Sequence, residues 1–538
     1  MTADFVAWPE ADAARYRAAG YWRGEPFARF LQRVTGEFGE RTALVDDRVR
    51  LTYRELAERA RRVACGLRAL GVAAGDRVLV QLPNRTEFAV LWFALHELGA
   101  VPVHTQPGHR HAEMIHLARL SQAVAYVVPD VHARFDYREL ASLVRAHVPS
   151  LRHVIVVGDP GGGFTAFDDL LSTAPTPMAN ESRPGDLALL LLSGGTTGQP
   201  KLIPRTHDDY LYNARAAAEV CGLDEDSVYL AVLPVAFNFT MSCPGVLGVL
   251  GAGGTVVLAD NPDPSYCFDL VEREHVTITA INPLLTPVWL DEAIAAAADL
   301  SSLEVLQIGG ARLSDDLARQ VVEGFGCTLQ QVFGMAEGLL CMTRLDDSPE
   351  VIGTTQGTPV SEADEVRVVD ECGVEVPEGC VGELLTKGPY TLRGYYRAAE
   401  HNATAFVDGF YRTGDLVRRL PSGHLVVVGR SKDQINRAGE KISAPEVEGH
   451  LQAHPAVRLA ALLPAPDPVL GERSVAFIVP SGACAPTRED LVTYLTACGL
   501  AAYKTLDEVR LLNEMPSTPV GKADKRELSR LLNGAVGP

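Results

Sequence analysis

Short apolar runs alternate with longer amphipathic segments over roughly the first two thirds of the chain. The runs at 76–84, 124–130 and 153–159 are rich in β-branched residues and end in turn-forming residues, which is typical of buried strands. Between such runs, segments 52–70 and 86–100 place apolar side chains at helical spacing. Strands that alternate with helices predict βαβ units and a mostly parallel sheet.

The pattern changes towards the C-terminus. Segments 365–388 and 410–430 have the strand-and-turn spacing of antiparallel β-structure, and a polar joint and a new helix follow them. We therefore predict an α/β fold with a large N-terminal domain, residues 1–431, built of mainly parallel α/β subdomains and a β-rich subdomain. A small mobile α+β domain, residues 432–538, is expected to follow.

Composition narrows the classes of function. The chain has 538 residues and a net charge of −19, from 49 basic and 68 acidic residues, which argues against a nucleic-acid surface. The ten cysteines form no CxxC pair, and the start lacks a hydrophobic signal region, so we expect a cytoplasmic protein without disulfides or zinc. Segment 227–259 carries no charge, but prolines and glycines interrupt it. It predicts a buried loop, helix and strand, and no membrane span.

A glycine-rich loop follows the apolar run at 187–192. A Walker P-loop is excluded, because Lys201 is followed by Leu202 where that motif needs Ser or Thr, and Pro204 favours extended chain over helix. The pattern predicts a strand, a flexible loop SGGTTG and a second strand. Backbone N–H groups and hydroxyls of such a loop can close over a polyphosphate, although an isolated SGGTTG can also be a plain hairpin turn.

Four motifs together carry a resemblance. SGGTTGQPK, YRTGD at 411–415, GRSKDQINRAGEKI at 429–442 and PSTPVGKADKREL at 516–528 occur in this order. In this combination the chain resembles the adenylate-forming superfamily of acyl-CoA synthetases, luciferases and peptide-synthetase adenylation domains. With QVFGMAEGL at 331–339, it is similar to the stand-alone aryl-acid adenylating enzymes of siderophore pathways.

The resemblance implies a reaction in two halves that needs ATP, Mg²⁺ and a thiol. It assigns catalytic roles to Lys522 between carboxylate and α-phosphate, to Glu337 as the Mg²⁺ ligand, and to Arg430 near the phosphates. It also makes Asp415 the ribose acceptor and Lys432 the hinge of a rotating small domain. The implied ATP and AMP site comprises Ser193, Gly194, Gly195, Thr196, Thr197, Gly198, Lys201, Gly309, Gly310, Ala311, Val332, Phe333, Gly334, Met335, Asp415, Val427, Arg430 and Lys522.

The acid pocket implied by the resemblance comprises Phe237, Asn238, Phe239, Cys243, Gly309, Ala336 and Leu340. Asn238 would bond a phenolic oxygen ortho to the carboxylate. Enzymes for 2,3-dihydroxybenzoate have serine and valine where this chain has Cys243 and Leu340, so the resemblance points to salicylate. Phe237 departs from the histidine that is usual in the family. The acid therefore stays open between salicylate, 2,3-dihydroxybenzoate, anthranilate and 3-hydroxypicolinate.

The thiol acceptor is expected to be phosphopantetheine on a separate aryl carrier protein or free coenzyme A, since the chain has no appended carrier motif. Two rival functions remain. One is a catabolic aryl-CoA ligase, and the other is a catalytically silent adenylate-binding protein, against which the presence of Lys522, Asp415 and Glu337 argues. Neither a nucleic acid nor a membrane is an expected partner.

Overall fold

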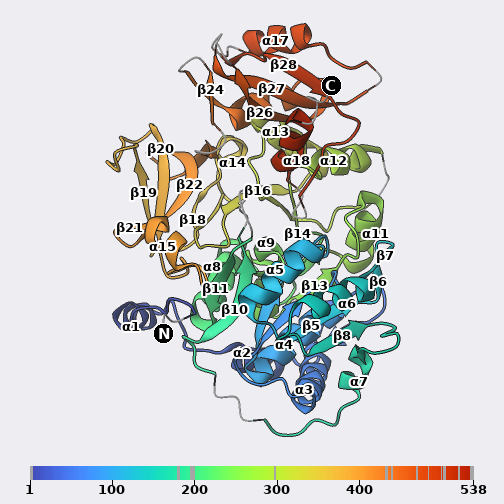
Figure 1. Ribbon diagram of the computed structural model, residues 1–538. Helices are drawn as coiled ribbons and strands as arrows, with labels where there is room; N and C mark the ends of the chain where they lie inside the picture. Colours follow the sequence, from blue (N-terminus) through green and yellow to red (C-terminus); the bar gives the residue numbers. More distant parts are fainter. Residues whose placement is uncertain are drawn as a thin grey trace.

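The computed structural model describes residues 4–178, 182–193, 200–295, 299–430, 434–437, 440–467, 470–482, 484–498, 500, 504–518 and 522–533. Two large sheets and their helices make up the lower and middle parts of the molecule in Figure 1. A smaller sheet lies beside them, and the C-terminal residues form a separate unit at the top. The α/β class expected from the sequence is confirmed.

One sheet has nine strands in the order β18-β17-β16-β15-β14-β12-β13-β1-β2. Their bounds are β1 Thr42–Val45, β2 Arg50–Thr52, β12 Val228–Ala231, β13 Thr255–Leu258, β14 Ile278–Ile281, β15 Val305–Gly309, β16 Thr328–Gly334, β17 Leu340–Met342 and β18 Thr358–Pro359. The strands from β1 to β16 in this order pair in parallel, and β2, β17 and β18 pair antiparallel at the two edges. The central strands are buried on both faces, as their apolar runs require.

A second sheet has seven strands in the order β11-β10-β4-β3-β5-β8-β9. Their bounds are β3 Arg77–Val80, β4 Val101–His104, β5 Ala125–Pro129, β8 His153–Val157, β9 Thr165–Ala166, β10 Leu187–Leu192 and β11 Leu202–Thr206. All pairs are parallel except β10 with β11. A separate two-stranded ribbon consists of β6 Val131–His132 and β7 Phe135–Asp136.

Helices form three layers around these two sheets. The layer between the sheets contains α2 Phe27–Phe38, α3 Tyr53–Ala69, α4 Thr86–Leu98, α8 His207–Val220 and α10 Gly245–Ala252. Helices α11 Pro264–Glu274, α12 Thr286–Ala295 and α13 Asp315–Phe325 cover the outer face of the nine-stranded sheet. Helices α5 His111–Ser121 and α6 Tyr137–His147 cover the outer face of the other. Successive side chains of a strand point to opposite faces of its sheet. In β12, Tyr229 and Ala231 therefore belong to the hydrophobic core between the two sheets, and Leu230 belongs to the core under the outer helices.

The remaining large-domain helices are short or peripheral: α1 Glu10–Ala18, α7 Phe167–Leu171, α9 Asn238–Ser242, α14 Pro349–Thr354 and α15 Ala399–Ala405. The β-rich subdomain consists of β19 Glu365–Val369, β20 Val381–Lys387, β21 Phe406–Val407, β22 Phe410–Arg419 and β23 Leu425–Arg430. All its strand pairs are antiparallel, which confirms the expectation for segments 365–388 and 410–430.

The C-terminal unit is an α+β structure. Its strands are β24 Gln434–Arg437, β25 Glu440–Ser443, β26 Val457–Asp467, β27 Gly471–Pro480 and β28 Glu508–Leu511, and its helices are α16 Ala444–Gln452, α17 Arg488–Ala497 and α18 Lys525–Asn533. Helices α16 and α17 pack on one face of the sheet, and α18 packs on the other. The boundary predicted between 431 and 432 falls on residues 431–433, outside the described residues, and stays a prediction.

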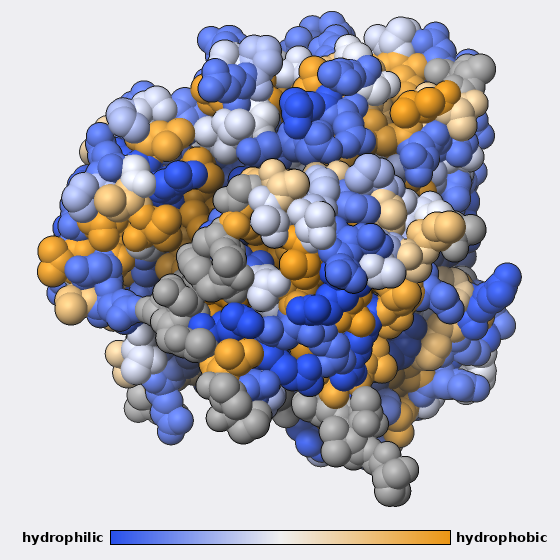
Figure 2. Space-filling model, turned by 90° about the horizontal axis from the view of Figure 1, so that it is seen from above, coloured by the Kyte–Doolittle hydropathy of each residue, from blue (hydrophilic) through white to orange (hydrophobic). Residues whose placement is uncertain are grey.

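The charge-free segment 227–259 folds as expected from its prolines and glycines. It forms β12, the short helix α9, helix α10 and β13, and most of its residues are buried. Among the described residues, no helix is long and apolar enough to cross a membrane. Seen from the side of the small domain, hydrophilic side chains cover most of the surface and apolar ones lie in scattered groups (Figure 2).

Candidate functional site

The base of the glycine-rich loop lies between β10 and β11. These strands pair antiparallel, with Leu190 opposite Pro204, so extended chain follows the loop as predicted and no P-loop helix begins there. The Ser193 N–H donates to the Lys201 carbonyl at 3.0 Å, and the Lys201 N–H donates to Ser193 Oγ at 3.2 Å. The predicted phosphate contacts Gly194, Gly195, Thr196, Thr197 and Gly198 lie outside the described residues.

Glu337 lies close to Lys201 through a tyrosine that the sequence analysis did not single out. The Tyr395 hydroxyl donates to Glu337 Oε1 at 2.8 Å and lies 2.8 Å from the Tyr411 hydroxyl. Lys201 Nζ lies 5.5 Å from the centroid of the Tyr395 ring. Burial and the Glu337 charge raise the pKa of Tyr395, so its hydroxyl keeps the proton that it donates.

Main-chain hydrogen bonds fix the loop that carries Glu337. The Leu392 N–H donates to the Glu337 carbonyl at 2.7 Å, and the Arg205 Nη1 donates to the Ala336 carbonyl at 3.1 Å. Arg205 Nε also donates to Asp209 Oδ1 at 2.7 Å. The Glu337 side chain is itself buried. A single carboxylate held in this way matches how Mg²⁺ is usually bound, by one or two carboxylates together with substrate phosphates. The described residues contain no cluster of three or more His, Cys, Asp or Glu that could hold a metal alone.

The predicted nucleotide walls lie at the ends of neighbouring strands. Gly309 ends β15 and pairs with Val332 of β16, and Gly334 pairs with Leu340 of β17. Gly310 has φ +89°, a left-handed conformation that glycine adopts without strain. Ala311 follows it in the chain. Ligands of α/β proteins bind at such carboxyl ends of parallel strands, so the topology makes this edge a candidate nucleotide site.

The β-rich subdomain places Asp415 opposite Arg430 on β22 and β23. Asp415 is buried, and its N–H donates to Thr413 Oγ1 at 2.9 Å; the Arg430 side chain is outside the described part. The Val427 N–H donates to Gln356 Oε1 at 2.8 Å. Val427 packs against the same hydrophobic cluster as Phe333 and Met335, so these predicted nucleotide contacts from two subdomains lie together.

Lys522 reaches this strand edge from the small domain. Its backbone is held by two bonds to Thr518: the Thr518 N–H donates to the Lys522 carbonyl at 2.7 Å, and the Lys522 N–H donates to Thr518 Oγ1 at 3.1 Å. Lys522 Cε lies 3.9 Å from the position that a Cβ would take on Gly310. The structure therefore brings Lys522 beside the glycine turn after β15. The predicted hinge residue Lys432 lies outside the described residues.

The predicted acid-pocket residues gather around the start of α9. Phe239, Cys243 and Leu340 belong to one buried cluster, against which Phe237 and Ala336 pack. Two close approaches need glycine. A Cβ on Gly309 would lie 3.0 Å from Phe239 Cζ, and a Cβ on Gly334 would lie 2.8 Å from Leu340 Cδ1.

A hydrogen-bond relay orients the Asn238 amide. Ser242 Oγ donates to Asn238 Oδ1 at 3.2 Å, which turns Asn238 Nδ2 towards Cys243 Sγ at 3.6 Å. Asn213 of α8 holds the same turn, because its Nδ2 donates to the Ser242 carbonyl at 2.7 Å. Neither Ser242 nor Asn213 was singled out from the sequence, and the only signal was that a buried amide needs partners.

His104 at the end of β4 supports the segment just before Phe237. Its Nε2 accepts from Trp92 Nε1 at 2.9 Å, so its Nδ1 carries the proton and donates to the Ala236 carbonyl at 3.0 Å. Burial lowers the pKa of His104 to about 4, which keeps the ring neutral near pH 7.

Cys243 is a buried thiol and a poor nucleophile. Burial raises its pKa to about 11, so the reactive thiolate is scarce near neutral pH. All ten cysteines are free. The structure thus supports a packing role for Cys243.

The layered α/β fold, with strand-end glycines facing a lysine from a second domain, defines a nucleotide-dependent enzyme of two domains. Residues 31–396 match the model of the AMP-binding enzyme family, and residues 446–522 match that of the AMP-binding enzyme C-terminal domain. The chain belongs to the AMP-binding enzyme family.

Relatives at high identity agree with this assignment. The chain is 50% identical to the 2,3-dihydroxybenzoate-AMP ligase of Bacillus subtilis (strain 168), over 99% of this chain and 98% of the relative. It is 48% identical to the salicyl-AMP ligase / salicyl-S-ArCP synthetase of Mycobacterium tuberculosis, over 99% and 95%. The apo structure of Mycobacterium smegmatis MbtA is 46% identical and superposes with a TM-score of 0.77, over 98% of this chain and 99% of that one. The resemblance to adenylate-forming enzymes is confirmed.

Proposed function

We propose that this enzyme converts an aryl carboxylic acid, preferably salicylate, to its aryl-adenylate with ATP and then transfers the acyl group to a thiol. The observation that carries the choice of acid is the pair Cys243 and Leu340. The Cys243 thiol, a weak donor, lies 3.6 Å from the Asn238 amide, and Leu340 is buried in the same cluster. A 3-hydroxyl on the ring would meet an apolar surface there. The names of relatives that act on salicylate and on 2,3-dihydroxybenzoate support the aryl class.

In the first half-reaction, a carboxylate oxygen of the acid attacks the α-phosphorus of ATP. The new P–O bond forms as the bond to the bridging oxygen breaks, and pyrophosphate leaves with that electron pair. The Lys522 ammonium, beside Gly310, offsets the negative charge that concentrates on the two reacting anions. Bound at Glu337 and the phosphates, Mg²⁺ would supply charge neutralisation for the leaving group.

The pocket residues orient the ring for this attack. Asn238 Nδ2, turned by Ser242 towards the pocket, would donate to the 2-hydroxyl oxygen of salicylate. The Phe239 ring, next to Gly309, would pack against the face of the substrate ring. Asp415 would accept from the ribose hydroxyls, and Ser193 and Lys201 would close the loop over the terminal phosphates.

In the second half-reaction, a thiol attacks the acyl carbonyl and AMP leaves. We assign residues 1–431 to the domain that holds acid and nucleotide, and residues 432–538 to a domain that rotates about Lys432 and withdraws Lys522. The thiol is phosphopantetheine on a separate carrier protein or coenzyme A. We place the enzyme in the cytoplasm, because its ten cysteines are free and six are buried or half-buried.

Acid-dependent ATP–pyrophosphate exchange tests the proposal. Salicylate should give the highest kcat/KM in a panel with 2,3-dihydroxybenzoate, benzoate and anthranilate. Exchange with none of these acids would refute aryl-acid activation, and a clear preference for 2,3-dihydroxybenzoate would refute the interpretation of Cys243 and Leu340.

Replacing Lys522 separates catalysis from nucleotide binding. Lys522→Ala should lower the exchange rate by at least about a hundredfold, because one charge-stabilising group typically contributes about 2.7–4 kcal/mol. Its affinity for ATP, measured by calorimetry, should change little. Near-normal exchange would contradict the catalytic role of Lys522, and Lys525→Ala, on the adjacent helix α18, serves as the matched control.

A further inference from the structure

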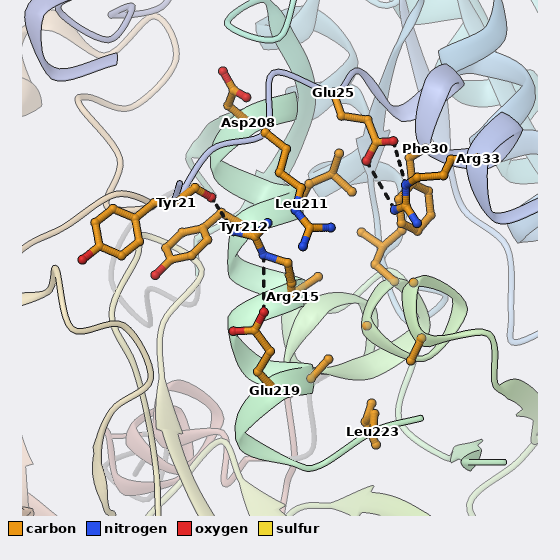
Figure 3. Close-up of a pocket in the computed structure, with 17 residues that line it drawn as sticks. Tyr21, Glu25, Phe30, Arg33, Asp208, Leu211, Tyr212, Arg215, Glu219 and Leu223 are labelled. Atoms are coloured by element: carbon orange, nitrogen blue, oxygen red, sulfur yellow. Dashed lines mark hydrogen bonds and ion pairs between the residues drawn. The ribbon is translucent and has the colours of Figure 1, made fainter. Parts of the chain in front are cut away.

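A cavity of about 240 Å³ lies behind the acid pocket, between the segment before α2 and the helices α8 and α10. Figure 3 shows the side chains that line it, which come from these elements. Its floor is apolar and includes Phe30, Leu211, Leu247 and Gly251. Volumes of about 300–1,000 Å³ are usual for drug-sized ligands, so this cavity suits a smaller molecule.

All three carboxylates at its rim, Glu25, Asp208 and Glu219, have an arginine within ion-pair distance. Glu25 Oε1 accepts from Arg33 Nε at 2.9 Å, and Asp208 Oδ2 accepts from Arg17 Nη2 at 2.6 Å. Figure 3 shows the Arg33–Glu25 pair on one side of the cavity and Arg215 with Glu219 on the other. Arg33 and Glu25 therefore neutralise each other, and Asp208 is neutralised by an arginine that does not line the cavity.

Arg215 is incompletely satisfied. Its Nη2 donates to the carbonyls of Gly20 at 3.0 Å and Tyr21 at 2.8 Å. Its Nε is buried and has no hydrogen-bond partner among the described residues, and Glu219 Oε1 lies 3.6 Å away, beyond hydrogen-bond length.

A second guanidinium, Arg23, lies at the same cavity. Arg23 is exposed and forms no ion pair within the described part of the chain. Burial lowers the pKa of Arg215, and the charge of Arg23 lowers it further, while the charges of Glu219 and Glu25 oppose this shift only in part. The two guanidinium groups therefore repel each other across the cavity. An anion placed between them would convert this repulsion into attraction and give Arg215 Nε an acceptor.

We propose that this cavity is a second ligand site that binds a small organic monocarboxylate with an apolar body. The carboxylate lies between Arg23 and Arg215, and the apolar part covers Leu211, Leu247 and Gly251. The site is distinct from the acid pocket, because α8 separates the two. Asn213, on the other face of α8, donates to the carbonyl of Ser242 in the acid pocket, and its neighbours Tyr212 and Ala214 line the cavity.

Equilibrium dialysis of labelled benzoate against the full-length enzyme tests the proposal. The acid and nucleotide sites are first saturated with a non-hydrolysable benzoyl-adenylate analogue. The wild-type enzyme should still bind one equivalent of benzoate, with a Kd of about 1 mM or below. Arg23→Gln should weaken this binding by about tenfold or more, while Arg29→Gln, an exposed arginine of α2 outside the cavity lining, should not.

A second variant tests the apolar contact. Ala252→Leu adds bulk to a lining position at the end of α10 and should also weaken benzoate binding. ATP–pyrophosphate exchange by Arg23→Gln should stay within about twofold of wild type, since surface substitutions rarely change stability by more than about 0.5 kcal/mol.

Three results would overturn the proposal. They are no saturable benzoate binding to the blocked enzyme up to about 10 mM, equal binding by wild type and Arg23→Gln, or competition by acetate as strong as by benzoate. The ratio of the benzoate dissociation constants of wild type and Arg23→Gln is the decisive quantity. This comparison does not require the analogue to occupy the acid site. Failure of the proposed function would therefore appear in the ATP–pyrophosphate exchange assay and not in this comparison.

Discussion

The hydroxyl of Ser242 lies within hydrogen-bond distance of both the carbonyl and Oδ1 of Asn238, and its removal gives a specific prediction. Ser242 Oγ donates to Asn238 Oδ1 at 3.2 Å, leaving Nδ2 directed towards Cys243. In Ser242→Ala the amide loses this bond and can turn over. The backbone of the helix keeps its support, because Asn213 Nδ2 still donates to the carbonyl of residue 242 at 2.7 Å.

The size of the effect follows from one neutral hydrogen bond. Such a bond contributes about 0.5–1.5 kcal/mol, so kcat/KM for salicylate should fall about two- to twelvefold. Benzoate has no 2-hydroxyl for Asn238 to bind. Its kcat/KM should therefore change by less than about twofold, and the salicylate-to-benzoate ratio is the quantity that reports the loss.

Initial rates of ATP–pyrophosphate exchange with both acids give this ratio. Thr240→Ala is the matched control, because Thr240 lies on the same short helix and its buried hydroxyl has no partner among the described residues. Its ratio should equal that of wild type. An equal fall with both acids in Ser242→Ala would indicate general disorder of the pocket, and an unchanged ratio would mean that other groups hold the Asn238 amide; either result refutes the reasoning.

Two further predictions concern specificity and pH. The double variant Cys243→Ser, Leu340→Val should raise kcat/KM for 2,3-dihydroxybenzoate relative to salicylate by about fivefold or more. The reason is that the serine hydroxyl can form a hydrogen bond with the 3-hydroxyl, which contributes about 1 kcal/mol. A double variant that keeps the wild-type preference would contradict this prediction. Burial lowers the pKa of His104 and of His207 from 6.5 to about 4. As the pH falls below 6.5, the unfolded chain therefore takes up protons at these two residues before the folded protein does. The free energy of unfolding then falls by up to about 1.4 kcal/mol per pH unit for each histidine. Thermal unfolding measured between about pH 7 and pH 5 should show this loss of stability. The variant His111→Gln, which changes an exposed histidine, should show the same dependence of stability on pH as wild type. A stability that does not change with pH would show that His104 and His207 are not buried as neutral rings.

Local sequence patterns correctly predicted the two strands that flank the glycine-rich segment. Leu202 and Pro204 act on their own backbone, so the extended strand after Lys201 could be inferred without any tertiary information. The same holds for the interrupted segment 227–259, whose prolines and glycines set its short elements. By contrast, the placement of Lys522 beside Gly310 depended on the resemblance, because no local pattern relates two residues of different domains.

The partners of the candidate site residues could not be predicted. Tyr395 bonds Glu337, and His104 bonds the carbonyl of Ala236, across long separations in the chain. These side chains were missed because tyrosine and histidine in apolar surroundings are most often ordinary core residues. Only the folded structure shows that the Tyr395 hydroxyl contacts the candidate phosphate site at Glu337, and that His104 contacts the backbone just before the candidate acid pocket.

Arg205 explains how one helix can position both halves of the site. It lies on β11, at the exit of the glycine loop, and its buried guanidinium bonds Asp209 of α8 at 2.7 Å and the Ala336 carbonyl at 3.1 Å. The ion pair with Asp209 offsets the buried charge of Arg205, and the bond to Ala336 links the Glu337 loop to α8. The same helix carries Asn213, which holds the acid-pocket turn. In the proposed reaction the carboxylate and the α-phosphate must meet within about 3–3.5 Å. The common attachment to α8 limits how far the Glu337 loop and the turn at Ser242 can move apart, which would help to keep that distance.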